Sequence, residues 1–524
     1  MIMQKNHVLL INPAIYDKSQ NKKVSAIVNK TFPTSLGILA GFLMKHGVSV
    51  RILDEQVHPL GVRELEQAIE GLARPRIIGL SVLTMNCGRA YEISSMIHDI
   101  DPHTTVIFGG VHPTVVPEEP LGKRGVDLVI RGEGEEPLRD VVQAILSGQE
   151  YHHVLGLTYM RDGKILSNPD APLINDLDTI PPFPYELFEE DMHAYPSFSG
   201  IIGSRGCPFK CTFCSARSIS GLQFRFHSVE RLISEMKILT RKYGQKSIHL
   251  MDDNIGVHRP HFLEMCDAIV KEGLHKDAWF HGSMRGDNAT EEVLEASKRA
   301  NFKILYFGLE TGTERLMKVV DKGETLAEVV DAVHRATAKD IQIGATLIFG
   351  LPTETRAERY ETMRVVDSLP LFSVRFNTLT PYPGTPVWHT EEKKGNVNIK
   401  GCWENFGVQY MWESDDIPYV PDSSDRLELM WDTMYANFAN YLSPKGIWRV
   451  LTKNYAGGNV IKLESTWYLS FTEIRKMFNV TAYLLLRFLN VGVRLAFRYF
   501  VKGLRNLFSR IAKPFKRRSS LCRR

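Results

Sequence analysis

The sequence is poor in cysteine, nearly neutral in net charge and free of long apolar runs. Seven cysteines in 524 residues are too few for a small secreted protein stapled by disulfides. A formal net charge of +4 gives no indication of a nucleic-acid partner, and we expect none. No uninterrupted apolar stretch is long enough to span a bilayer. We also find no internal repeat of the length that solenoid proteins show.

The amino terminus lacks the pattern of a signal peptide. Six residues lead directly into the short apolar run His7–Ile11, which is typical of a first strand rather than of a signal sequence. A composition of 44% hydrophobic and 24% charged residues is that of a soluble globular protein, and the length allows two to four domains. We therefore expect a cytoplasmic protein whose thiols stay reduced.

Two series of alternating strand and helix patterns follow one another. The first predicts strands at 7–12, 48–53, 77–83, 105–108 and 127–130, with helices at 35–45, 62–72, 88–100 and 135–146. The second predicts strands at 200–204, 247–251, 279–283, 304–308, 342–349 and 374–379, with helices such as 229–243, 259–272 and 326–338. Such alternation predicts parallel sheets with crossover helices, and for the first series a doubly wound α/β fold.

The remaining segments set the expected domain boundaries. A hairpin is predicted at 157–166, turning through Asp162-Gly163, and a proline-rich linker follows it up to residue 197. We therefore expect five parts: 1–150, the hairpin and linker at 151–197, 198–390, a mostly helical region at 391–480, and a basic tail at 481–524.

The most informative stretch contains Cys207, Cys211 and Cys214 in the pattern CxxxCxxC. Three thiolates so spaced can hold three irons of a cubane cluster and leave the fourth iron open to bind a substrate. Zinc is the alternative, but structural zinc sites are closed by four ligands, and no second ligand pair lies nearby. Chance burial of three cysteines does not explain the spacing.

With Phe213 directly before the last cysteine, the motif resembles the signature of the radical S-adenosylmethionine (SAM) enzymes. The resemblance covers roughly residues 5–390. It implies a [4Fe-4S] cluster on the three cysteines, chelation of SAM by the open iron, and cleavage of SAM to a 5′-deoxyadenosyl radical. It also implies an open six-stranded barrel over the second series of strands, and an external electron donor such as flavodoxin or ferredoxin.

Other elements of that family follow the predicted barrel strands. The resemblance implies that Asp252 and Asp253 contact the SAM amino group, and carboxylates there can accept hydrogen bonds from an ammonium. Arg285 suits the SAM carboxylate, while Glu310 and Gly350 belong to elements around the methionine and adenosine moieties. A helix cap or a solvated loop charge is the alternative interpretation of each.

The first series of strands resembles cobalamin-binding domains. Ser81 and Leu83 form an SxL element after the third strand, and Gly109 and Gly110 form a glycine pair after the fourth. Both lie at the edge where doubly wound sheets bind ligands, and glycines allow the backbone to approach a ligand closely.

Gly132 and Glu133 belong to an Arg-Gly-Glu-Gly-Glu stretch after the fifth strand, in the position that it has in cobalamin-dependent radical SAM enzymes. The DxHxxG element, whose histidine binds cobalt in cobalamin mutases and methyltransferases, is missing. The chain has His58 four residues after Asp54 instead, and we do not assign His58 as a ligand. The alternative is a domain that has kept the fold and lost the corrinoid.

The carboxyl-terminal tail predicts a helix over 481–507 with two different sides. Five basic residues fall on one side and leave leucines, phenylalanines and valines on the rest: Arg487, Arg494, Arg498, Lys502 and Arg505. Six more basic residues follow between 513 and 524. This pattern is typical of a helix that lies on an anionic membrane surface. The alternative is a packing helix with a solvated basic edge.

These features together predict a cobalamin-dependent radical SAM enzyme, of the branch that holds the anaerobic magnesium-protoporphyrin ester cyclase and hopanoid-modifying enzymes. The expected reaction is methyl transfer to an unactivated carbon of a lipid-like or otherwise hydrophobic small molecule, at the inner face of a membrane. Anaerobic oxidative cyclisation or ring rearrangement is an alternative, because the cofactors carry the chemistry. A non-catalytic iron–sulfur or cobalamin sensor is another, although a sensor would not need the barrel-end motifs.

Overall fold

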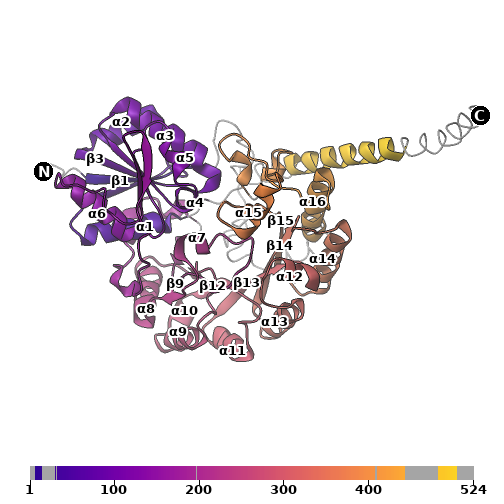
Figure 1. Ribbon diagram of the computed structural model, residues 1–524. Helices are drawn as coiled ribbons and strands as arrows, with labels where there is room; N and C mark the ends of the chain where they lie inside the picture. The colour runs from indigo at the N-terminus through magenta and orange to yellow at the C-terminus, as the bar shows by residue number, and fades with distance from the viewer. Residues whose placement is uncertain are drawn as a thin grey trace, which may run out of the picture.

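The computed structural model describes residues 6–14, 30, 32–195, 198–407, 410–442 and 482–503. Two sheets with their own helices lie side by side, and the last described helix extends away from them (Figure 1).

The first sheet has the strand order β2-β1-β3-β4-β5-β6-β7. Its first five strands pair in parallel: β1 (Asn6–Asn12), β2 (Val50–Asp54), β3 (Leu72–Ser81), β4 (Thr105–Gly109) and β5 (Leu128–Ile130). The predicted hairpin, β6 (Leu157–Arg161) and β7 (Lys164–Ser167), adds two antiparallel strands to the edge. The order 2-1-3-4-5 is flavodoxin-like, which confirms the predicted fold of this part.

Helices cover both faces of this sheet because successive strand residues point to opposite sides. Leu9 and Ile11 pack with α2 (Val62–Glu70) and α3 (Cys87–Ile100), whereas Val8 and Leu10 pack with α1 (Thr34–Lys45) and α6 (Glu135–Leu146). Two shorter helices, α4 (Val111–Val115) and α5 (Glu118–Leu121), lie between β4 and β5. A strand buried on both faces has to be apolar where it is buried, as β1 is over residues 8–11.

The second sheet has the order β15-β14-β13-β12-β11-β8, with every neighbouring pair parallel. Its strands are β8 (Gly200–Ile201), β11 (Ser247–Leu250), β12 (Trp279–Met284), β13 (Phe302–Glu310), β14 (Gln342–Phe349) and β15 (Ser373–Thr378). Within the described residues the sheet ends at β8 and β15 without closing, so the predicted open (β/α)6 barrel is confirmed.

The barrel helices are α8 (Val229–Lys237), α9 (Arg259–Lys271), α10 (Leu274–Asp277), α11 (Glu291–Arg299), α12 (Glu314–Val319), α13 (Leu326–Ala338) and α14 (Arg356–Ser368). A two-stranded antiparallel ladder of β9 (Ser204–Arg205) and β10 (Arg225–Phe226) stands between β8 and β11, and α7 (Arg217–Ser220) lies in the connection between its strands.

The region after the barrel contains helices, as predicted, but less regularly than expected. Helix α15 (Pro386–Lys393) is followed by mostly irregular chain up to α16 (Arg426–Leu442). Trp403 and Phe406 in this irregular part complete the core on the α2–α3 side of the first sheet, and the Trp403 indole donates to Glu119 over 2.8 Å. The segment therefore ties the carboxyl-terminal region back to the amino-terminal domain.

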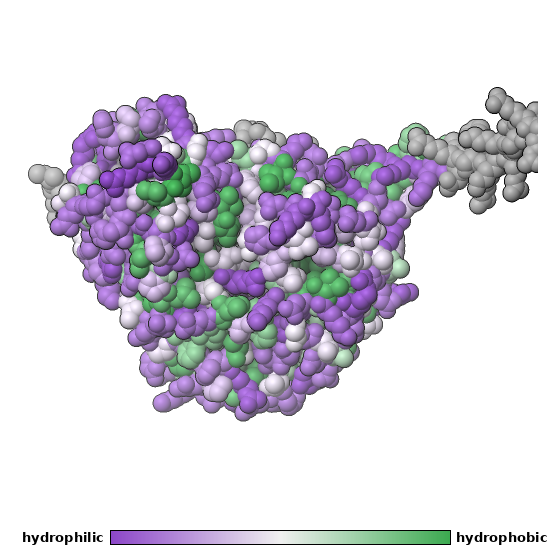
Figure 2. Space-filling model, in the orientation of Figure 1, coloured by the Kyte–Doolittle hydropathy of each residue, from purple (hydrophilic) through white to green (hydrophobic). Residues whose placement is uncertain are grey.

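Residues 482–503 form a helix in which three arginines pair with acidic residues of the protein body, whereas Lys502 is exposed. Arg487 donates to Asp415 over 2.5 Å, Arg494 pairs with the same carboxylate, and Arg498 pairs with Asp425. The exposed residues of this helix include an apolar row: Leu485, Leu486, Leu489, Val493, Phe497 and Phe500. The basic side, which the sequence predicted to lie on a membrane surface, is thus partly paired with the protein body, and hydrophobic residues are visible where the helix leaves the body (Figure 2).

Arg505 and the basic segment 513–524 lie outside the described residues. None of the described helices combines the length and the apolar character needed to cross a bilayer.

Candidate active site

The three predicted cluster ligands lie on the loop that joins β9 to β10. Cys207, Cys211 and Cys214 are half-buried and form no disulfide. Burial raises the pKa of all three thiols, that of Cys214 to about 11, so a bound metal is what would hold them as thiolates. Among the described residues, no three or more Cys, His, Asp or Glu side chains gather around one metal position. Sulfurs that each bind a different iron of a cubane need no such convergence, so the loop fits a cluster better than zinc.

Arg285, at the carboxyl end of β12, lies directly against this loop. Its guanidinium carbon is 3.6 Å from the ring centroid of Phe209, two residues after Cys207. The guanidinium also donates to the Asp287 carboxylate over 3.0 and 2.7 Å and to the Lys322 carbonyl over 2.6 Å. These contacts fix the positive charge beside the cysteines, and its pairing with a SAM carboxylate stays a prediction.

Lys322 is a buried residue of this site that sequence reasoning missed. Its ammonium donates to the Glu310 carboxylate and the Gly308 carbonyl, each over 2.6 Å, and lies 3.3 Å from Glu324. Burial alone would lower the pKa of Lys322, but the charges of Glu310 and Glu324 raise it above the usual value. Lys322 thus stays charged, close enough to Cys211 for their charges to interact.

Glu310, which the sequence analysis placed among the SAM contacts, forms an ion pair with Lys322 in the structure. Glu310 also has a left-handed backbone, with φ of 56°, at the end of β13. A signal for Lys322 was present in Asp321-Lys-Gly-Glu324, but charged stretches of this kind are usually solvated surface.

Asp252 and Asp253 follow β11. Asp252 is buried, whereas Asp253 is exposed. Asp252 accepts hydrogen bonds from the Gly203 amide over 3.1 Å and from the Ser204 hydroxyl. Burial raises the pKa of Asp252 to about 6, and desolvation also raises the pKa of Asp253. Both carboxyl groups can therefore gain from a ligand that donates hydrogen bonds or carries positive charge.

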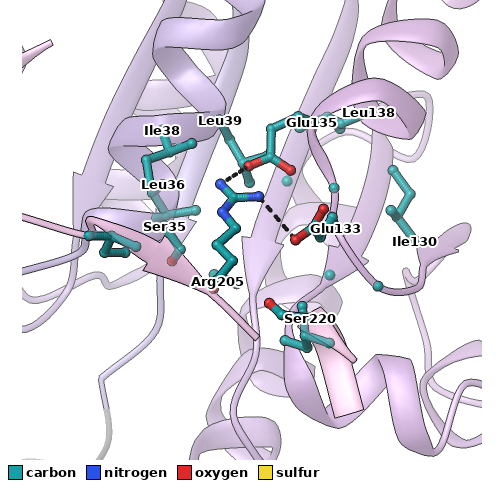
Figure 3. Close-up of a pocket in the computed structure, with 18 of the residues that line it drawn as sticks. Ser35, Leu36, Ile38, Leu39, Ile130, Glu133, Glu135, Leu138, Arg205 and Ser220 are labelled. Atoms are coloured by element: carbon teal, nitrogen blue, oxygen red, sulfur yellow. Dashed lines mark hydrogen bonds and ion pairs between the residues drawn. The ribbon is translucent and has the colours of Figure 1, made fainter. Parts of the chain in front are cut away.

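A cavity of about 360 Å³ lies between the two domains (Figure 3). The barrel contributes Asp252, Asp253 and Arg205 to its wall, and α1 contributes an apolar part that includes Leu36 and Leu39. The amino-terminal domain contributes all of its predicted contacts except Leu83: Ser81, Gly109, Gly110, Gly132 and Glu133. The structure thus brings predicted cobalamin contacts of the amino-terminal domain and predicted SAM contacts of the barrel to one cavity.

Bare backbone forms part of the cavity wall. A Cβ built on Gly109 would come no closer than 3.8 Å to another atom, and one on Gly132 would meet nothing within 4 Å. At Gly110, φ is 105° and a Cβ would lie 2.7 Å from the Val82 carbonyl oxygen, so only glycine fits there. A wall with open glycines and an apolar side fits a large ligand such as a corrinoid.

Several residues considered in the sequence do not line this cavity. They are the three cysteines, Arg285 and Glu310, and also Leu83, Phe213, Gly350 and His58. Leu83 is exposed, and its amide donates to Asn86. Phe213 packs in a small apolar cluster, and the Gly350 amide donates to Glu354. His58, which we did not assign, pairs with Asp191 over 2.8 Å. Contacts of Leu83, Phe213 and Gly350 with a cofactor stay predictions.

Comparisons with known proteins agree with this division into two parts. Residues 201–366 match the radical SAM superfamily, and residues 24–142 match the B12 binding domain. An uncharacterized methyltransferase of Pyrococcus horikoshii is 33% identical over 359 residues, which cover 68% of this chain and 77% of the relative. The anaerobic magnesium-protoporphyrin IX monomethyl ester cyclase of Rubrivivax gelatinosus is 24% identical over 428 residues, 79% of this chain and 74% of the relative.

Among solved structures, a radical SAM methyltransferase from Kitasatospora setae, with cobalamin and a [4Fe-4S] cluster bound, aligns with a TM-score of 0.68 and 16% identity. The alignment covers 94% of this chain and 100% of that chain. At this identity the likeness shows a shared fold.

Proposed function

We propose, because the chain belongs to the radical SAM superfamily and carries a B12-binding domain, that it transfers a methyl group to an unactivated carbon of a hydrophobic small molecule. The observation that carries the proposal is the single cavity that the glycines of the amino-terminal domain share with the carboxylates of the barrel. A corrinoid held by the glycines and a SAM molecule near the carboxylates would then face one another across it.

The chain's own residues hold and orient these groups. Cys207, Cys211 and Cys214 would ligate the [4Fe-4S] cluster, and the cavity would hold the cobalamin. When bound, the cofactors supply radical generation and methyl carriage. Asp252 and Asp253 would accept hydrogen bonds from the SAM amino group, and the apolar side of the cavity would exclude water from the reacting carbon. An external donor such as flavodoxin or ferredoxin would reduce the cluster.

Methyl transfer is favoured over cyclisation by the relatives. The Pyrococcus horikoshii protein, at 33% identity, is named a methyltransferase, whereas the Rubrivivax gelatinosus cyclase is 24% identical. The cyclase relationship nevertheless makes anaerobic oxidative cyclisation the second candidate function.

The products of SAM distinguish these functions without the native substrate. Donation of the methyl group leaves S-adenosylhomocysteine, whereas reductive cleavage leaves 5′-deoxyadenosine and methionine. We expect the reconstituted holoenzyme, with cobalamin, SAM and dithionite, to form both S-adenosylhomocysteine and 5′-deoxyadenosine, as measured by liquid chromatography and mass spectrometry. A cyclase would form only 5′-deoxyadenosine, and a sensor neither product.

The matched control for this assay is Cys211→Ala. It removes one of three cluster ligands, so we expect iron content and 5′-deoxyadenosine both to be lost. A Cys211→Ala variant with full iron and full cleavage would contradict the cluster assignment.

We also propose that the helix over 482–503 docks on a membrane, which supports a lipid-like substrate. Val493 and Phe497 are 68% and 67% exposed, one helical turn apart, and the apolar row continues through Leu489 and Leu486. The basic segment 513–524 follows in the sequence and complements an anionic lipid surface. A helix with an outward apolar row beside basic residues matches helices that lie in the interface plane. We therefore propose that the enzyme acts at the inner face of a cytoplasmic membrane.

A further inference from the structure

The loop that carries the three cysteines begins and ends at a pair of facing arginines. In the β9–β10 ladder, Arg205 lies directly opposite Arg225, and the cysteines are in the connection between them. Two like charges at facing positions of a ladder repel one another, so this pair needs a counter-charge. Whatever supplies that counter-charge also holds both ends of the cysteine loop.

The counter-charge comes from the amino-terminal domain. Arg225 donates to both oxygens of Glu133, over 2.9 and 2.8 Å, and Arg205 lies 3.4 Å from the same carboxylate. Arg205 also donates to Glu135 over 2.5 Å. Figure 3 shows the Arg205 guanidinium between the two glutamates. The side chains are 3 to 12% exposed, and buried charge pairs of this kind are costly to break.

The same glutamates belong to the wall of the cavity. Glu133 and Glu135 alternate with Gly132 and Gly134 along the loop after β5, and all four residues line the cavity together with Arg205. One ion network therefore joins the wall of the cavity to the ends of the cysteine loop. A change in the conformation of the cysteine loop therefore disturbs the cavity wall, and a change in the cavity wall disturbs the loop.

We propose that Arg205 is a positioning residue that couples loading of the iron–sulfur cluster to corrinoid binding in the cavity. The proposal rests on the proposed function, because it takes the cluster and the corrinoid as the two ligands. A cluster on the three cysteines orders their loop, the ordered loop fixes Arg205, and Arg205 holds the Glu133–Glu135 segment in the shape that receives the corrinoid. Such coupling is reciprocal, so the corrinoid favours retention of the cluster by the same factor.

Arginine is required at this position because its planar fork reaches two carboxylates at once. Lysine keeps the positive charge but presents its donors from one nitrogen, so it does not reproduce the arrangement in which two guanidinium nitrogens each face a different glutamate. Arg205→Lys therefore weakens the coupling while it leaves the charge balance of the network intact.

The test is the dissociation constant of hydroxocobalamin, titrated anaerobically into the full chain before and after reconstitution of the cluster. We expect the cluster-loaded chain to bind at least about fivefold more tightly, and Arg205→Lys to bind equally in both states. Arg139→Lys is the matched control, because Arg139 lies on α6 of the amino-terminal domain, outside the cavity lining, and pairs with the adjacent Asp140. This variant should show the same ratio of dissociation constants, without and with the cluster, as the unmodified chain.

Should Arg205→Lys fail to load a cluster, Glu135→Gln replaces it, since it removes one of the two carboxylates from Arg205 and should reduce the ratio. The coupling alone would be overturned if the unmodified chain bound hydroxocobalamin equally well with and without the cluster. It would also be overturned if a variant that loads the cluster kept the same ratio of the two dissociation constants as the unmodified chain. No binding of hydroxocobalamin in either state would overturn the proposed corrinoid function together with the coupling.

Discussion

At the scale of single residues, the two glycines at the end of β4 have different reasons to be glycine. Gly110 has a positive φ and no room for a Cβ next to Val82, so its substitution would strain the backbone whether or not a ligand binds. Gly109 has room for a side chain, and the space next to it is the cavity. Gly109 is therefore the better position at which to test ligand binding separately from folding.

We predict that Gly109→Leu abolishes corrinoid binding and leaves the fold intact, because its Cβ would come no closer than 3.8 Å to another atom and the side chain would occupy the cavity that Gly109 lines. The measurement is hydroxocobalamin uptake by absorbance, together with the melting temperature. His58→Ala is the control, since His58 pairs with Asp191 on the surface, and it should bind as the unmodified chain does. Full uptake by Gly109→Leu would place the corrinoid elsewhere.

At the scale of elements, the turn between β14 and α14 is held by a buried carboxyl group. Burial raises the pKa of Glu354 to about 8, although Arg359 lies 3.8 Å away. Arg359 is itself fully buried and donates to Asp432 of α16 over 2.9 Å, so its charge is already balanced. The Glu354 carboxyl group therefore favours its neutral form. In this form it accepts a hydrogen bond from the Gly350 amide at the end of β14.

This raised pKa predicts a pH-dependent contribution to stability. Between pH 4.5 and about 8 the unfolded chain ionises Glu354 while the folded chain keeps it protonated, so stability falls as pH rises through this window. The shift corresponds to at most roughly 5 kcal/mol. We expect Glu354→Gln to remove this decline, which unfolding at pH 5 and pH 8 would measure. Parallel pH profiles for the two proteins would contradict it.

The helix over 482–503 yields a second prediction at this scale. We expect Val493→Glu combined with Phe497→Glu to abolish sedimentation with liposomes that contain anionic lipid, because both side chains stand outward in the apolar row. Cluster loading should be unchanged, since the helix lies beyond both cofactor domains. Deletion of 481–524 is a less selective test, because it also uncovers Trp431, against which Gly492 packs.

The control for that experiment is Ile165→Glu combined with Leu166→Glu, which places the same two charges on the exposed strand β7. This control variant should sediment with the liposomes as the unmodified protein does. Liposome binding by the control variant and by the unmodified protein should weaken at high salt. Equal sedimentation of the helix variant and the control would refute membrane docking.

At the scale of the whole molecule, the irregular chain around Trp403 joins the two ends of the protein. Trp403 is buried, donates to Glu119, packs edge-on against His112 and lies in the core cluster of the amino-terminal domain. The amino-terminal domain therefore depends on residues almost three hundred positions later for part of its core.

We predict that Trp403→Ala lowers the stability of the amino-terminal domain by about 3–5 kcal/mol, the usual cost of removing a buried tryptophan. Because a protein of several domains need not unfold in one step, calorimetry should show the transition of this domain shifting to lower temperature before the barrel unfolds. A single transition at an unchanged temperature would show that the segment contributes no stability.

The sequence by itself determined the two sheets and the strand ends at which the predicted site residues stand. Strand and helix periodicity are local, and so is the spacing of Cys207, Cys211 and Cys214 on one loop. Ser81, Gly109 and Asp252 were proposed from family motifs that follow predicted strands, and residues at the carboxyl ends of parallel strands gather at one edge of a sheet.

Only the tertiary structure decided which charges meet and which face of a helix is covered. Glu133 and Arg225 are 92 residues apart, so no local pattern could show that this glutamate holds the cysteine loop. Lys322 looked like surface until the fold enclosed it with Glu310. The last helix has a basic and an apolar side in any structure, and the acidic residues Asp415 and Asp425 on the body determined that the basic side faces inward. Long-range charge pairing depends on where the backbone brings distant residues together, and that is a property of the folded chain.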